Sequence, residues 1–260
     1  MSIENIDIVK KNKLEEFDHY ARNYSGGMEN PIKNLFGKNL GQFIEIKAKW
    51  LMENLSKFPL KSLKETKLID YGCGDGTFIK ILKKLGFTGK LEGCDISQKM
   101  LEIAQKHLSD NLDPSPLYLI EKDRKLPFAD NYYDIVVACC VLHHIKPSKR
   151  TKLLNELTRI TKWGGHIVVF EHNPFNPITQ LIVRTTKIDR HASLIAAPEL
   201  QRIMSSNKNL GNIRTQYILY VPPAMQRPYL EWVDKILSQA FLGGQYVIVG
   251  EKYLFTPKTI

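Results

Sequence analysis

Three glycines at alternate positions, Gly72, Gly74 and Gly76, have the type and spacing of a ligand-binding bend. They follow the stretch 68–71, which is apolar except for Asp70, so a buried strand is expected to run directly into a backbone stretch that carries few side chains. Such a stretch can approach a nucleotide-like ligand closely, because no Cβ stands in the way. The helix expected from Thr77 points its first amides into the same space.

Two phosphate-binding turns fit this bend poorly. A P-loop requires Lys and then Ser or Thr directly after its last glycine, where this chain has Thr77 and Phe78. A dinucleotide fingerprint places its third Gly or Ala where Thr77 stands. The residues therefore favour a ligand that lacks a phosphate group.

Acidic residues end three successive apolar stretches of the chain. Asp70 lies just before the bend, Asp95 lies 19 residues past Gly76, and Asp123 follows the stretch 117–120. Each aspartate alone also fits a helix N-cap or a turn. Together they suit a ligand that donates hydrogen bonds, and the spacing of Asp95 suits a carboxylate that accepts from both ribose hydroxyls.

From about residue 17 onward the chain resembles the class I S-adenosylmethionine-dependent methyltransferases, on the strength of this bend and these acids. The resemblance implies S-adenosyl-L-methionine as cofactor and S-adenosyl-L-homocysteine as product. It places Asp70 opposite the methionine ammonium and Asp123 at the adenine amino group. The other cofactor contacts that it implies are Cys73, Ile96, Met100, Arg124, Ala138 and Cys139.

The segment 17–24 is similar to the N-terminal lid of small-molecule methyltransferases. In that lid the residue that matches Tyr24 closes over the cofactor. Packing of an ordinary helix is the alternative interpretation of the same residues. We expect residues 1–66 to form a helical lid and residues 67–260 to form the methyltransferase domain.

Histidines after the fourth expected strand are the candidate general bases. Methyl transfer from a sulfonium is an in-line displacement, and a base matters mainly when the acceptor is a hydroxyl. His144 is the first candidate, because related methyltransferases often carry a histidine there, and His143 is its neighbour. Glu171 and His172 are second candidates at the end of the fifth strand. A packing role is the alternative for each of them.

Alternating strand and helix patterns predict a parallel sheet with helices on both faces. The helices are expected at 14–24, 40–55, 77–85, 97–107, 148–160 and 198–207, and the strands at 67–71, 90–94, 117–121, 134–140, 166–171, 213–221 and 245–253. The family resemblance implies an α/β, Rossmann-like fold with seven strands in the order 3-2-1-4-5-7-6, the last one antiparallel. Pocket-covering insertions are expected at about 173–197, taken as irregular, and 222–244.

Composition restricts the partners and the location of the chain. A net charge of +10 is spread as +2 over residues 1–66, +3 over 67–171 and +5 over the remainder, which makes nucleic acid an unfavoured partner. The four cysteines have no metal-ligand spacing, so neither a metal nor a disulfide framework is expected. No apolar run has the length of a membrane span, and a cytoplasmic location is expected.

The insertions suggest the class of acceptor. Residues 170–177, together with Asp189 and residues 243–246, are similar to uncharacterised methyltransferases encoded beside sugar- and lipid-modifying enzymes. The Asn/Asp-Pro-Pro-aromatic turn of base-methylating enzymes is absent after the fourth strand. Arg184, Arg190 and His191 could bind an anionic acceptor, and residues 229–237 leave peripheral membrane contact open.

The sequence therefore predicts an enzyme that methylates a small molecule, a glycan, lipid or other metabolite, through oxygen. An RNA or protein methyltransferase and a non-catalytic adenosylmethionine-binding module are the alternatives. The oligomeric state is left open.

Overall fold

The computed structural model describes residues 40–109, 115–121, 123–186, 189, 192–221 and 240–253. The expected lid helix at 14–24, with Tyr24, lies outside the described residues, as do Arg190, His191 and most of the insertion at 222–244. The assignment of residues 1–66 and 67–260 to a lid and a domain stays a prediction.

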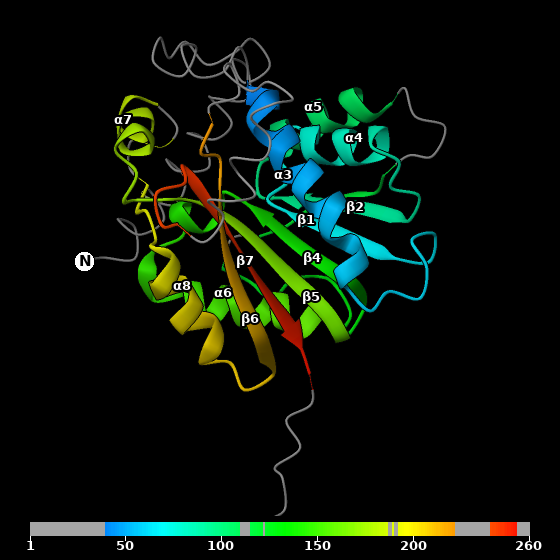
Figure 1. Cartoon of the computed structure of the whole chain (residues 1–260). Helices are drawn as coiled ribbons and strands as arrows, with labels where there is room; N and C mark the ends of the chain where they lie inside the picture. Colours follow the sequence, from blue (N-terminus) through cyan, green and yellow to red (C-terminus); the bar gives the residue numbers. More distant parts are fainter. Residues whose placement is uncertain are drawn as a thin grey trace, which may run out of the picture.

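The described chain alternates helices with strands, as the pattern predicts (Figure 1). The helices are α3 (Leu40–Asn54), α4 (Thr77–Lys84), α5 (Gln98–Leu108), α6 (Pro147–Ile160), α7 (Pro177–Thr185) and α8 (Ala197–Ser205), with short 3-10 turns η1 (Leu55–Lys57) and η2 (Leu142–His144). The strands are β1 (Lys67–Tyr71), β2 (Lys90–Asp95), β3 (Leu117–Leu119), β4 (Tyr133–Cys139), β5 (Thr161–His172), β6 (Leu210–Ile218) and β7 (Gln245–Lys252).

The seven strands form one sheet in the order β3-β2-β1-β4-β5-β7-β6. The strands β1 to β5 pair in parallel, and β7 runs antiparallel to both β5 and β6. In Figure 1 the β7 arrow points away from the edge at which α7 follows β5. Both the predicted strand order and the antiparallel last strand are confirmed.

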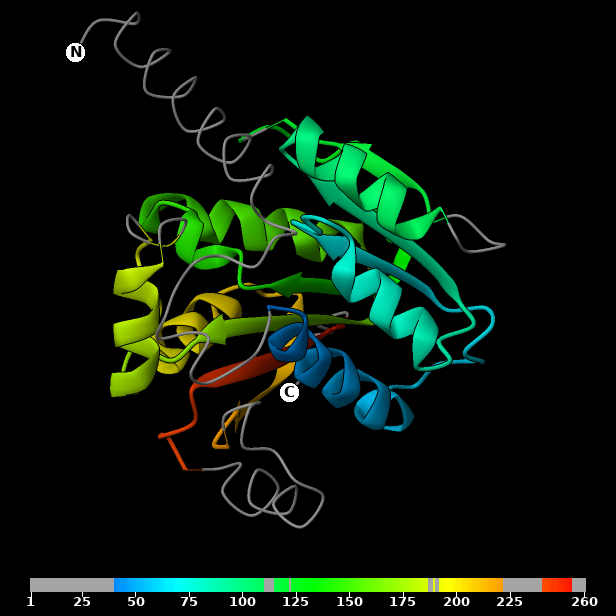
Figure 2. The same cartoon turned by 90° about the horizontal axis from the view of Figure 1, so that it is seen from above.

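Two apolar clusters cover the two faces of the sheet. One cluster joins α3, α4 and α5 to the sheet through residues such as Leu51, Ile79 and Leu68. The other joins α6 and α8 to the opposite face through residues such as Leu157 and Leu200. Figure 2 shows α3 and α6 on opposite sides of the strands. The alternation of inward-pointing side chains along each buried strand supplies both clusters.

The insertion after β5 contains a helix that the sequence interpretation missed. Residues 177–185 form α7, whereas the whole stretch 173–197 was expected to be irregular. Asn176 caps the helix by accepting from Thr179 N, and Pro177 occupies the first turn. Both residues are common helix-start signals, so the prediction of irregular structure was wrong.

Two late strands differ in extent from their prediction. β5 begins at Thr161 instead of His166. Thr161 pairs with Tyr133 and His166 pairs with Ile135, so the register shifts between these two pairs. Gly164, with φ of 78°, lies within the shifted stretch. β6 ends at Ile218, because Leu219 adopts a φ of 65° that an extended strand cannot continue.

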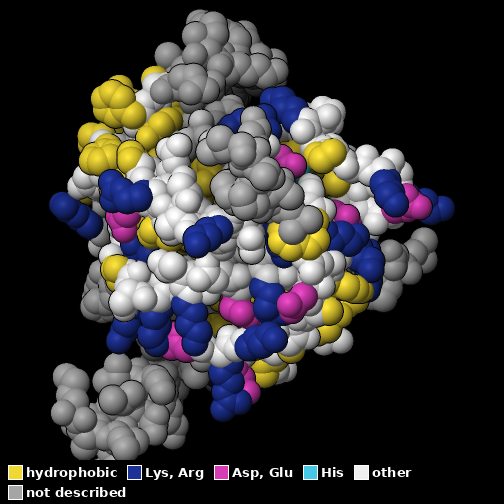
Figure 3. Space-filling model, turned by 90° about the horizontal axis from the view of Figure 1, so that it is seen from below, with side chains coloured by type: hydrophobic (Ala, Val, Ile, Leu, Met, Phe, Trp, Pro, Cys, Tyr) yellow, Lys and Arg dark blue, Asp and Glu magenta, His cyan; other side chains and the backbone are white. Residues whose placement is uncertain are grey.

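Positive charge is dispersed on the face of the molecule in Figure 3, where Lys and Arg side chains lie among acidic and neutral ones. Several are paired, including Lys90 with Glu92 and Lys162 with Asp134. Within the described residues, no helix combines the length and apolarity needed to cross a membrane.

Candidate active site

The bend after β1 has the backbone conformation that only glycine adopts easily. Gly72, Gly74 and Gly76 have φ values of 73°, 53° and 74°. The amide of Gly72 donates to Cys94 O at 2.8 Å, and the amide of Gly74 donates to Asp95 Oδ2 at 2.9 Å. The bend is therefore tied to the end of β2, where the second acid stands.

The three glycines serve different purposes. A Cβ on Gly74 would meet only Met100 Cε, at 4.0 Å, so this position leaves open space on the cavity side. A Cβ on Gly76 would lie 3.1 Å from Ala104 Cβ, so this glycine lets α4 and α5 pack closely. Gly76 does not line the cavity, although it was a predicted cofactor residue.

We expect Gly72→Ala to destabilise the protein by about 2–4 kcal/mol. A Cβ there would lie 2.7 Å from Val141 Cγ2, which adds overpacking to the strain of the positive φ. Gly86→Ala is the matched control, because Gly86 has φ of 92° but nothing within 4 Å of the added Cβ. Denaturant unfolding of both variants measures the difference, and equal losses would rule out the collision with Val141.

Asp70 is a buried carboxylate with an unsatisfied oxygen. Its residue is 1% exposed, and Oδ1 has no hydrogen-bond partner. Burial, together with the charges of Asp95 and Asp75, raises the pKa of Asp70 to about 8. A buried acid in this state favours a cationic ligand, because a positive charge would restore the ionised form.

Asp95 connects the bend to α5. Its Oδ2 accepts from Gly74 N and its Oδ1 accepts from Ser97 N, each at 2.9 Å. Ionised carboxylate oxygens can each accept more than one hydrogen bond. Ile96 and Met100 line the cavity beside it.

The third predicted acid stands at the same edge of the sheet. Asp123 adopts a φ of 66°, lines the cavity and pairs with Lys149. Arg124 also lines the cavity and pairs with Glu121 at 2.7 Å. The structure thus brings the three predicted carboxylates to one cavity.

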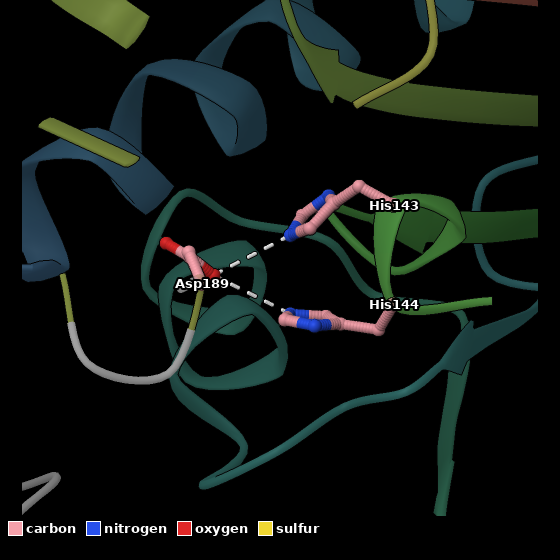
Figure 4. Close-up of side chains that lie close together, drawn as sticks. All are labelled: His143, His144 and Asp189. Carbon is pink, nitrogen blue, oxygen red and sulfur yellow. Dashed lines mark ion pairs between the residues drawn. The ribbon is translucent and has the colours of Figure 1, made fainter. Parts of the chain in front are cut away.

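A buried ion network lies at the other end of that cavity (Figure 4). His143 Nδ1 lies 2.6 Å from Glu171 Oε2, and its Nε2 lies 3.5 Å from Asp189 Oδ1. Burial opposes charge on His143, but the two carboxylates raise its pKa well above the usual value. Its imidazole is therefore charged and fixed between them.

His144 shares Asp189 with His143. Its Nε2 lies 3.5 Å from the same Asp189 Oδ1, and both rings point toward that carboxylate in Figure 4. The His144 side chain is 19% exposed, whereas that of His143 is 1% exposed. His144 is thus the more accessible of the two predicted bases, and both line the cavity.

Glu171 and Ala138 lie behind the cavity wall. Glu171 is fully buried and accepts from Leu142 N at 2.6 Å as well as contacting His143, so it positions η2 and does not line the cavity. Ala138 is fully buried in β4 and is likewise absent from the lining. The predicted residues Cys73 and Cys139 do line the cavity.

One cavity of about 260 Å³ joins the acids of the glycine bend to the histidines. Residues that sequence reasoning did not assign to the site also line it: Lys47, Asp189 and Gln245. A signal for Lys47 was present, because it is a charged residue four positions from both Phe43 and Leu51 on the apolar side of α3. Asp189 carried no local signal, because its partners are distant in sequence.

Comparison with known proteins supports the family resemblance. Residues 69–169 match the family model described as a methyltransferase domain. This stretch of the chain is similar to class I S-adenosylmethionine-dependent methyltransferases. The cofactor of this family is S-adenosylmethionine, and the stretch that matches holds the glycine bend, Asp95, Asp123 and the two histidines.

The curated relatives match part of this chain. The ubiquinone/menaquinone biosynthesis C-methyltransferase UbiE from Burkholderia cenocepacia is 33% identical over 106 residues, which are 40% of this chain and 42% of that protein. The chain thus matches less than half the length of this curated relative.

Two solved structures cover most of the chain. A SAM-dependent methyltransferase from Archaeoglobus fulgidus superposes with a TM-score of 0.61 at 16% identity, over 85% of this chain and 97% of that one. Magnesium protoporphyrin IX methyltransferase from Synechocystis with bound SAM gives a TM-score of 0.59 at 17% identity, over 91% of each chain. At this identity the likeness supports the fold.

Proposed function

We propose that this methyltransferase transfers the methyl group of S-adenosylmethionine to an oxygen atom of a small-molecule acceptor, a glycan, lipid or other metabolite. The observation that carries the proposal is the single cavity with a cofactor end and a histidine end. The cofactor supplies a methyl group on a positively charged sulfur, which leaves as a neutral thioether. The residues of the chain have to bind the cofactor and the acceptor, orient them, and exclude water.

The cofactor end fits this ligand residue by residue. Asp70, buried with an unsatisfied Oδ1, would hold the methionine ammonium. Asp95 would accept from the ribose hydroxyls, and the open side of Gly74 would let the ligand approach the backbone. Ile96 and Met100 would contact the adenine. Asp123 would accept a hydrogen bond from the amino group of the adenine. The apolar character of these two side chains suits a flat aromatic ring.

The histidine end fits removal of a proton from the acceptor. We assign His144 as the general base, since it lines the cavity and Asp189 can orient its ring. His143 and Glu171 are positioning residues, because their contacts are mainly to one another and to η2. His172 is a weaker base, because burial and the charge of His143 lower its pKa to about 3.

Methylation at carbon is a second candidate, favoured by the match to UbiE, whose name describes a C-methyltransferase. The same base would then remove a proton from carbon. The chemical shift of a ¹³C-labelled methyl group in the product distinguishes carbon from oxygen. RNA or protein as acceptor is less favoured, because basic side chains are dispersed on the face shown in Figure 3.

Incubation with labelled S-adenosylmethionine and fractionated metabolites tests the proposal. We expect label in a low-mass fraction, and we expect His144→Ala to slow transfer by about 10²–10⁴-fold with adenosylhomocysteine affinity changed less than about threefold. His166→Ala, which alters a histidine of β5 that does not line the cavity, is the control. Label in RNA or protein would support those alternatives instead. Tight cofactor binding without transfer to any fraction would indicate a binding module.

A further inference from the structure

Lys47 is a buried cation that the described structure leaves without a counter-ion. Its residue is 3% exposed, and its ammonium donates to one backbone oxygen, that of Phe43, at 3.3 Å. Among the described residues, no carboxylate lies within ion-pair distance of its Nζ. Lysine is rarely buried without a partner, because an ammonium loses much solvation free energy when it leaves water.

The fold places this charge on the cavity. Lys47 lies one helical turn from Phe43 and one from Leu51, both of which are buried, so the helical repeat points it inward from α3. Its neighbour Lys49 points to solvent and pairs with Glu45 at 2.8 Å. Lys47 lines the cavity, and Lys49 does not.

The charge of Lys47 acts on groups at the ends of β4 and β5. It opposes the rise that burial causes in the pKa of Cys140, and it contributes to the low pKa of His172 after burial and His143. Burial raises the pKa of Cys139, the charge of Asp70 adds to that rise, and the charge of Lys47 opposes it. Lys47 lines the same cavity as His143 and His144.

We propose that Lys47 binds an anionic group, a carboxylate or a phosphate, of the methyl acceptor. The acceptors would then be acidic small molecules. The term acceptor rests on the proposed function, but anion binding at Lys47 does not. The cofactor also carries a carboxylate, on the same carbon as the ammonium that we assign to Asp70. The source of the anion therefore needs a test of its own.

The first experiment measures anion binding without any methyl transfer. Benzoate and phenyl phosphate are added to the full chain saturated with adenosylhomocysteine, with benzyl alcohol as the uncharged probe of similar shape. We expect both anions to raise Tm in the unaltered chain and in Lys49→Met, and we expect this rise to disappear in Lys47→Met and Lys47→Gln. Benzyl alcohol should act equally on all four proteins.

The second experiment identifies the source of the anion. Calorimetry compares adenosylhomocysteine with methylthioadenosine, which lacks the amino-acid carboxylate and ammonium. We expect Lys47→Met to change the affinity for either ligand by less than about threefold. A tenfold or greater loss for adenosylhomocysteine alone would assign Lys47 to the cofactor carboxylate and would overturn the proposal.

The third experiment uses the labelled transfer reaction. Cell metabolites are separated on an anion exchanger before incubation, and we expect the retained fraction to gain label. Label confined to the unretained fraction would overturn the acidic acceptor while leaving methyl transfer intact. Equal Tm shifts by benzoate in Lys47→Met and Lys49→Met would overturn anion binding at Lys47 whether or not any fraction gains label.

Discussion

Asp95→Ala should bind adenosylhomocysteine at least about 100-fold more weakly than the unaltered chain. The variant loses the acceptor for the ribose hydroxyls, and hydrogen bonds to a charged group contribute about 1.5–3 kcal/mol each. It also loses the acceptor for the amides of Gly74 and Ser97, so the bend itself is less ordered before the ligand arrives. Isothermal calorimetry at fixed pH and salt measures the change.

Asp134→Ala is the matched control for this prediction. Asp134 also accepts from a backbone amide, that of Lys67, at 2.8 Å, and it pairs with Lys162. It lies at the opposite end of the strands and does not line the cavity. If Asp134→Ala weakened binding as much as Asp95→Ala, the loss would come from general destabilisation of the sheet, and the ribose assignment would fail.

Binding of adenosylhomocysteine at pH 6.5 should release close to one proton from the unaltered chain and none from Asp70→Asn. In the ligand-free protein Asp70 has a pKa of about 8 and is therefore protonated at pH 6.5. An ammonium beside it requires the ionised carboxylate, so the proton has to leave. Affinity should then rise by about tenfold per pH unit up to about pH 8. Calorimetry in buffers of different ionisation enthalpy counts the protons.

The same pKa shift determines how the stability of the ligand-free protein depends on pH. The pKa of Asp70 in the folded chain lies above its ordinary value of 3.8, so Asp70 ionises at a lower pH in the unfolded chain than in the folded one. The free energy of unfolding therefore falls as pH rises from about 4 to about 8, by up to about 1.4 kcal/mol per pH unit from this group. Asp70→Asn should remove that slope. An unchanged slope in Asp70→Asn, or no proton release from the unaltered chain, would contradict the assignment.

The cofactor half of the site could be predicted because its signals are local. The glycine bend, Asp70 and Asp95 each lie at the end of a strand, and the hydrophobic pattern of a strand can be recognised from a few residues. The confirmed strand order came from the family resemblance. The resemblance also implied Ala138 as a cofactor contact, but only the structure places it behind the cavity wall.

The histidine half could be predicted only in part, because its geometry depends on pairs that are distant in sequence. The sequence marked His143, His144 and Glu171, yet it did not reveal that Glu171 binds His143 across 28 residues. Asp189 joined the network through folding of the insertion, and no periodicity predicts such a contact. To assign Lys47 to the site, one has to know which side of α3 faces the cavity.

The placement of β7 between β5 and β6 has a consequence for the order in which this chain can assemble. β6 is made before β7, but in the sheet it is not a neighbour of β5, and its strand partner among the described residues is β7, residues 245–252. During synthesis, one flank of β5 and one flank of β6 therefore remain unpaired until β7 has been made. A nascent chain that stalls before β7 would expose these two strand edges, so aggregation during translation should respond most strongly to changes in residues 245–252.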